Sequence, residues 1–77
     1  MKEKKDIVIK SKITGITYND NLVVHIWNVL QSYKFLVNGA TLVDLFPGHM
    51  NGEERICFVF YKEDFDKLQP LWVDHRL

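Results

Sequence analysis

The sequence has few residues that could cross-link a small protein through disulfides or metal ions. Its single cysteine, Cys57, cannot form a disulfide within the chain. The histidines His25, His49 and His75 lie far apart, and none is paired with another ligand at the spacing of metal-binding motifs. No signal peptide or long apolar run is present. We therefore predict no metal, no cofactor and no membrane span, and a cytoplasmic protein that is held together by packing.

Motifs of catalysis are equally scarce. Ser11 and Ser32 are the only serines, and neither lies in a Gly-x-Ser-x-Gly turn. Cys57 lies in an apolar stretch, where a reactive thiolate is disfavoured. The acidic pairs 53–54 and 63–64 suit a loop and the start of a helix better than acid–base chemistry. No glycine-rich phosphate loop is present, so we predict that the protein has no catalytic residues and is not an enzyme.

The net charge of the chain is zero, but the charged residues are unevenly distributed. The chain has 77 residues, of which 47% are hydrophobic and 13% aromatic, and this composition predicts one globular domain spanning 1–77. Residues 1–15 carry five lysines and two acidic side chains, whereas residues 16–77 carry five basic and eight acidic ones. We expect residues 1–5 to form a frayed basic end. The acidic remainder favours a basic partner.

The most informative stretch that is present is Ile56–Tyr61, six consecutive apolar or aromatic residues. Strand side chains alternate between faces, so Ile56, Phe58 and Phe60 point one way and Cys57, Val59 and Tyr61 the other. One face can bury against helices. The other needs a second cover, which is more of the protein, a partner or nucleic acid bases. The pattern indicates a binding module without naming its ligand.

Periodicity and turn signals predict the element order β-α-β-β-α. Apolar residues at helical spacing, including Val29, Leu30 and Tyr33, form the stripe that we expect the first helix to bury. The expected elements are a strand at 6–14, a helix at 20–35, a strand at 40–46, a loop at 47–54, a strand at 55–61, and a helix from 63 or 64 that Pro70 kinks or breaks. The fold class is therefore α+β, a single small domain in which two helices cover one face of a three-stranded, mostly antiparallel sheet.

Part of the chain is similar to known proteins. Residues Leu22–Leu68 combine a leucine-rich helix, an Asn-Gly stop, a hairpin, an aromatic strand, acidic residues and a second helix, centred on Arg55–Phe65. This stretch resembles small β-α-β-β-α proteins of phages and mobile genetic elements of Gram-positive bacteria. The resemblance implies a fold and a setting, but no chemistry, because those proteins have no assigned activity. The chain departs from them in a longer hairpin loop and a proline-interrupted last helix.

Protein binding is the function that most features favour. Large aromatic side chains are enriched at interaction hot spots, and Leu71 and Trp72 flank Pro70 on different helix faces. Val24 and Phe35 lie off the main stripe of the expected helix. We predict an accessory protein that binds another protein, such as one of DNA replication or host defence, and self-association into a homodimer stays open. The predicted contact residues are Trp72, Leu71, Phe35, Val24, Trp27 and Tyr61.

Single-stranded nucleic acid is the alternative ligand. Sheets that stack bases use alternating aromatic side chains on an open face, with cations beside them for the phosphates. The residues that would serve are Phe58, Phe60, Lys10, Lys12, Lys4 and Lys5. Acidic residues on both sides of the aromatic strand oppose this interpretation. The expected loop at 47–54 is either a recognition element or a plain connection.

Overall fold

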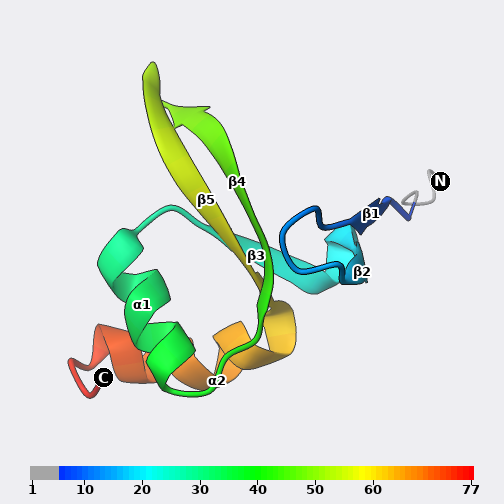
Figure 1. The fold of residues 1–77 in the computed structure, drawn as a ribbon. Helices are drawn as coiled ribbons and strands as arrows, with labels where there is room; N and C mark the ends of the chain where they lie inside the picture. Colours follow the sequence, from blue (N-terminus) through cyan, green and yellow to red (C-terminus); the bar gives the residue numbers. More distant parts are fainter. Residues whose placement is uncertain (1–5) are drawn as a thin grey trace, which may run out of the picture.

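The computed structural model describes residues 6–77 and has the predicted α+β class (Figure 1). A three-stranded antiparallel sheet has the order β3-β5-β4, and a separate two-stranded sheet pairs β1 with β2. Neither helix in the described part is long and apolar enough to cross a membrane. The elements are β1 (Val8–Lys10), β2 (Thr17–Asn19), the 3₁₀ turn η1 (Asp20–Leu22), β3 (Val23–Ile26), α1 (Val29–Val37), β4 (Leu42–Met50), β5 (Glu53–Tyr61) and α2 (Lys62–Val73).

The central strand is β5, and its side chains alternate as predicted. Phe58 and Phe60 face the helices, where Phe60 meets the Phe35 ring edge-to-face at 5.6 Å between centroids. Cys57 and Val59 face the other way, and both are fully buried. The helix-side core consists of Ile26, Phe35, Ala40, Phe60 and Leu68. These side chains fix both helices to one face of the sheet, as predicted.

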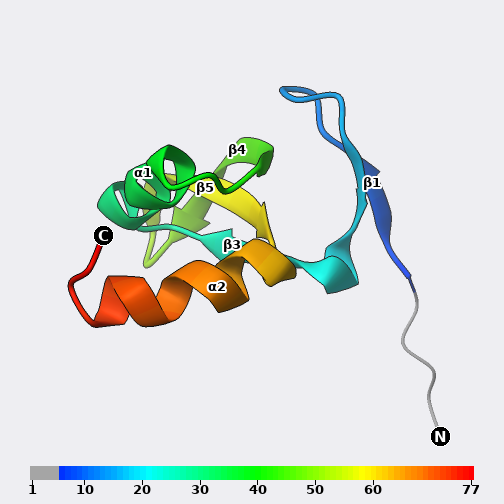
Figure 2. The same cartoon turned by 90° about the horizontal axis from the view of Figure 1, so that it is seen from below.

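The second cover of β5 is the protein's own N-terminal hairpin. The hairpin β1–β2 lies across the sheet from α1, with β5 between them (Figure 2). Its Tyr18 is 5% exposed and joins Val43, Cys57 and Val59 in a hairpin-side core. The strand predicted at 6–14 is therefore shortened to Val8–Lys10, because the chain turns back at Gly15 to pair with β2.

The helix predicted at 20–35 is wrong in its first half. Residues Asp20–Leu22 form η1, and Val23–Ile26 form β3, which pairs with β5. Three of the four residues of β3 are β-branched and fit a strand at least as well as a helix. The helix starts only at Val29, where the Oδ1 atom of Asn28 accepts the Gln31 N–H at 3.0 Å.

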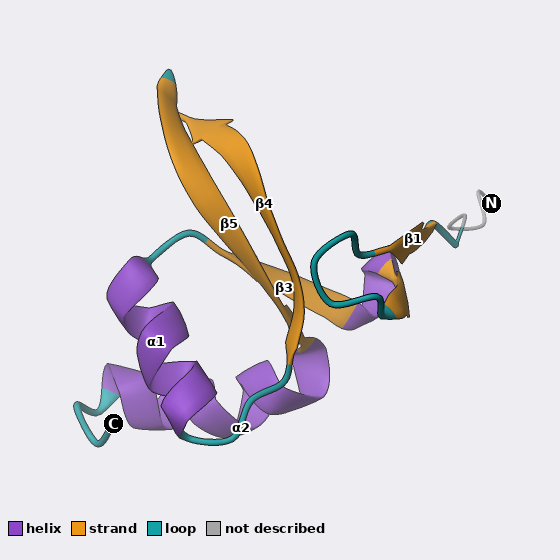
Figure 3. Ribbon diagram, in the orientation of Figure 1, coloured by secondary structure: helices purple, strands orange, loops and turns teal. Residues whose placement is uncertain are grey.

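The loop predicted at 47–54 is also wrong, and so is the longer hairpin loop inferred from it. Strands β4 and β5 run on to a two-residue turn, in which Asn51 and Gly52 have φ of 54° and 79°. This backbone suits a tight hairpin, and Asn-Gly is its preferred sequence. Residues 47–56 thus form a β-arm that projects past the helices (Figure 3). Pro47 is tolerated because β4 is an edge strand.

Helix α2 continues through Pro70 to Val73, so the predicted break there is wrong. Proline removes one backbone donor from the helix, which normally weakens it. Here Leu68, Leu71 and Trp72 pack against the helix-side core on both sides of the proline. Their burial holds the last turn in place.

Candidate protein-binding surface

Helix α1 carries large apolar side chains on its outer face. Leu30 is 57% exposed and Tyr33 is 60% exposed, and Val29 and Val37 are similarly open. We call Val29, Leu30, Tyr33 and Val37 the α1 stripe. Three of its members recur every fourth residue, which places them one above the other on the helix. A contiguous exposed apolar face of this kind is typical of an interaction site.

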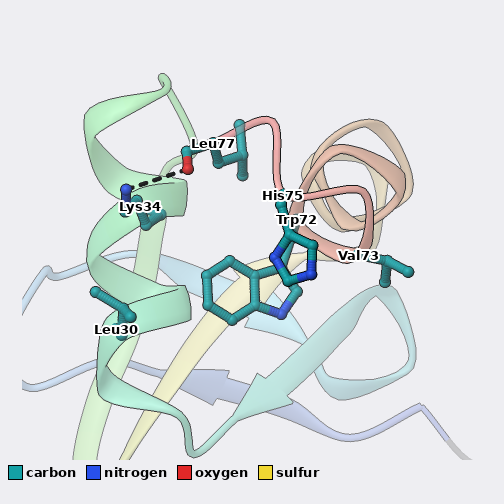
Figure 4. Close-up of a pocket in the computed structure, with 6 residues that line it drawn as sticks. All are labelled: Leu30, Lys34, Trp72, Val73, His75 and Leu77. Carbon is teal, nitrogen blue, oxygen red and sulfur yellow. Dashed lines mark hydrogen bonds between the residues drawn. The ribbon is translucent and has the colours of Figure 1, made fainter.

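A groove lies beside the stripe, between α1 and the C-terminal end of α2 (Figure 4). We call it the C-terminal groove; its volume is about 430 Å³, and the half-buried Trp72 indole lies in it. The Nζ atom of Lys34 donates to the backbone oxygen of Leu77 at 3.1 Å, which ties the chain end to α1. The lining residues are Leu30, Lys34, Trp72, Val73, His75 and Leu77.

A second groove lies on the other side of the stripe, between α1 and the β-arm. We call it the arm groove; its volume is about 520 Å³, and Trp27 lies in it. The Trp27 indole packs directly on Gly48, where an added Cβ atom would lie 2.7 Å from its Cη2 atom. Glycine is therefore what allows this close approach. The lining residues are Trp27, Asn28, Val29, Leu30, Met50 and Arg55.

Leu30 lines both grooves, so the three features form one continuous surface. We call the α1 stripe with its two grooves the two-groove surface. Each groove holds one of the two tryptophans in the chain. Tryptophan and tyrosine side chains in such positions commonly supply most of the binding energy of a protein interface.

The predicted protein contacts fall into four groups. Trp72 and Trp27 line the grooves, and both are half-buried, Trp72 against the helix-side core and Trp27 against the hairpin-side core. Val24 and Leu71 are half-buried against the helix-side core. Phe35 is fully buried, so its prediction as a contact residue is wrong. The sixth residue, Tyr61, is half-buried against the hairpin-side core. The structure thus brings only the two tryptophans to the two-groove surface.

The periodicity of the sequence predicted the buried face of α1 only in part. It indicated that Val29, Leu30 and Tyr33 are buried and that Phe35 is not, whereas the structure buries Phe35 and exposes the other three. At 100° per residue, the apolar residues of α1 other than Phe35 fall within one arc of about 120°, so the pattern of the helix itself favours the face that the structure largely exposes. Packing against Phe60 and Phe65 buries the single ring on the opposite side.

The residues predicted to bind nucleic acid do not form an open platform. Phe60 is fully buried, so its prediction as a stacking residue is wrong. Phe58 is half-buried against the helix-side core, and its role in stacking stays a prediction. Lys10 and Lys12 are exposed, but they lie on the N-terminal hairpin segment beside Phe46, away from the face of β5 that carries these rings. Lys4 and Lys5 lie outside the described residues.

A buried carboxylate that the sequence argument missed anchors the hairpin to the sheet. Asp44 accepts hydrogen bonds from Ser11 Oγ and Tyr18 Oη, both at 2.6 Å, and from the Leu45 N–H at 2.8 Å. Burial alone would raise the pKa of Asp44, but these bonds prevail and hold it below its ordinary value. Burial, together with the bond to this carboxylate, raises the pKa of Tyr18 far above 10. Asp44 therefore stays ionised and Tyr18 neutral near pH 7.

Asp44 also closes the outer edge of β4 to further strands. Its side chain takes the N–H of Leu45, and Pro47, two residues further along the same edge, has no N–H to donate. A β-bulge between Leu42 and Asp44 breaks the register there as well. Charged side chains, prolines and bulges are known devices against edge-to-edge pairing. Self-association through this edge strand is thus disfavoured.

The described residues do not assemble an evident reactive centre. Burial raises the pKa of the Cys57 thiol to about 11, so the group is protonated and shielded near pH 7. Within residues 6–77, no three side chains of the His, Cys, Asp and Glu types lie together in a way that could hold a metal ion.

Comparisons of the chain with protein-family models, curated proteins and solved structures find no match. The resemblance of residues 22–68 to proteins of phages and mobile elements therefore stays a prediction. What the protein does has to be inferred from the two-groove surface itself.

Proposed function

We propose that this protein is a non-enzymatic accessory protein that binds another protein through the two-groove surface. The observation that carries the proposal is Leu30, an exposed ridge shared by two grooves that each hold a tryptophan. Large contiguous apolar patches are uncommon on monomeric proteins and mark interaction sites. The exposed α1 stripe therefore supports binding to a partner that covers it.

The setting of this function follows from the resemblance alone. A phage or mobile genetic element as its source would place the protein in the cytoplasm of a bacterial cell. Partners there would include proteins of DNA replication or of host defence. The two-groove surface supports binding to a protein, and it does not distinguish between these partners.

The proposal is tested by capture from a lysate of the cell type that encodes the protein. The tagged protein is compared with its Leu30→Glu/Tyr33→Glu variant, with and without nuclease, and bound proteins are identified by mass spectrometry. We expect a partner that survives nuclease and is lost with the variant, because two buried carboxylates would oppose docking. The matched control is Ile7→Glu/Ile13→Glu, which places the same two charges on similarly exposed apolar residues of the N-terminal segment.

Two outcomes would contradict the proposal. Partners that the double variant captures as well as the parent does would place the interface elsewhere on the molecule. Captures that disappear with nuclease would make nucleic acid the ligand, and Lys10 and Lys12 would then be the first residues to examine.

A further inference from the structure

The charges around the two-groove surface differ from those of the chain as a whole. Beyond residue 15 the sequence has more acidic than basic side chains, yet none of the Asp and Glu residues in the described part of the chain lines either groove. The ionisable side chains that line them are Lys34, His75 and Arg55. The surface is therefore apolar with basic residues at its margins.

These cations are only partly neutralised by the chain. Lys34 is half-buried and already donates to the Leu77 oxygen at 3.1 Å, the contact that ties the chain end to α1. Arg55 pairs with Glu53 at 3.4 Å, and both side chains are largely exposed. An exposed pair of this kind is weak and easily exchanged for another partner. Arg55 thus remains available to a ligand, and Lys34 can reach one by exchanging its contact with Leu77.

We infer that the two-groove surface takes an acidic amphipathic segment of its partner, in which large apolar side chains are flanked by Asp or Glu. The inference rests on the proposed function and adds the chemistry of the partner. Apolar side chains would fill the two grooves on either side of Leu30, and the carboxylates would meet Lys34 and Arg55. Such complementarity speeds association and excludes wrong partners. This reverses the expectation of a basic partner, which was drawn from the acidic composition of residues 16–77.

A second copy of the chain fits the surface less well. A symmetric dimer through this surface would bring the same basic margin of each copy against the other. Like charges facing each other across an interface are unfavourable. The partner is therefore a different protein.

The test is a selection from a displayed library of random peptides, about 16 residues long. The bait is the full chain. The Leu30→Glu/Tyr33→Glu variant is added free in solution and in excess, so that peptides that bind outside the two-groove surface are removed. We expect the enriched peptides to combine Leu, Phe or Trp with more Asp and Glu than Lys and Arg. A synthetic copy of one enriched peptide is then measured by calorimetry.

Charge reversal decides the outcome. We expect Lys34→Glu/Arg55→Glu to lower the affinity for that peptide about tenfold or more. The control Lys10→Glu/Lys12→Glu should leave the affinity unchanged. Enriched peptides that are neutral or basic, or that bind the charge-reversed variant equally well, would overturn the inference that the partner segment is acidic. The proposed protein-binding function would then still stand. A library that yields no binder above the counter-selection would overturn both. Competition by a single-stranded oligonucleotide would assign the surface to nucleic acid instead.

Discussion

The two faces of β5 are covered by different means. On the helix side, α1 and α2 pack a purely apolar core around Phe35 and Phe60. On the hairpin side, the short strands β1 and β2 are fixed by hydrogen bonds that converge on the buried Asp44 carboxylate. Apolar packing depends little on pH, whereas a charged anchor fails when it is protonated. The helix-side cover should therefore be insensitive to pH, whereas the hairpin-side cover combines apolar packing around Tyr18 with an anchor that depends on the ionised Asp44.

The largest expected effect comes from breaking the helix-side core. Phe35→Ala removes a fully buried ring that touches Phe60 and Phe65. Truncations of this kind cost about 3–5 kcal/mol, which is comparable to the whole stability of many domains of this size. Circular dichroism and urea titration should show a largely unfolded protein, with Phe35→Leu much less affected. Near-native stability of Phe35→Ala would show that the helices are not held by this ring.

On the hairpin side, replacing Asp44 should destabilise the protein. Asp44→Ala leaves the hydroxyls of Ser11 and Tyr18 and the Leu45 N–H without their acceptor, and we expect a loss of about 3 kcal/mol. Hydrogen exchange should report faster exchange in β1 and β2 than in α1. Asp44→Asn, which keeps one acceptor oxygen, should lose less. Equal deprotection of the hairpin and the helices would mean that the two covers do not act separately.

Lowering the pH should reproduce part of the loss of stability that replacing Asp44 causes. The pKa of Asp44 is lower in the folded protein than in the unfolded chain, so its contribution is present above the ordinary value of 3.8 and is lost as pH falls through the folded value. Unfolding free energies of the parent and Asp44→Asn should therefore converge below about pH 4. A difference between the two proteins that stays constant down to pH 2 would contradict the role of the charge.

A smaller loss of stability is expected from a substitution at Gly48, where the β-arm contacts Trp27. Gly48→Ala places a methyl group 2.7 Å from the indole and forces the ring to move. We expect a loss of about 1–2 kcal/mol and an altered Trp27 emission when Trp72 is replaced by Phe. The neighbouring exposed residue gives the control, His49→Ala. An unchanged emission spectrum would show that the indole does not rest on Gly48 in solution.

The smallest effect on stability should come from the outer face of α1. Leu30→Glu/Tyr33→Glu changes side chains that are 57% and 60% exposed, so the free energy of unfolding should change by no more than about 0.5 kcal/mol. Urea titration beside Phe35→Ala compares the two faces of the same helix. A large loss from the double variant would assign the α1 stripe to the core and remove it from the proposed interface.

Local signals in the sequence were reliable where several of them agreed. The alternation in Ile56–Tyr61, the Asn38-Gly39 stop of α1 and the acidic start of α2 were each read correctly, because they depend on neighbours along the chain. At residues 23–26 the signals conflicted, since the same apolar residues fit the arc of a helix and the pairing of a strand. Pairing with the distant β5 decided in favour of the strand.

Side-chain alternation and helix caps are properties of a few adjacent residues, so the α+β class and the two apolar faces of β5 could be predicted from the sequence. What covers each face, which side of α1 lies outside, and the hydrogen bonds of Asp44 with Ser11 and Tyr18, 33 and 26 residues away, follow from the tertiary structure. Those outcomes depend on contacts between segments that are remote in the chain. No local pattern encodes them, so the two-groove surface emerged only when the segments were assembled.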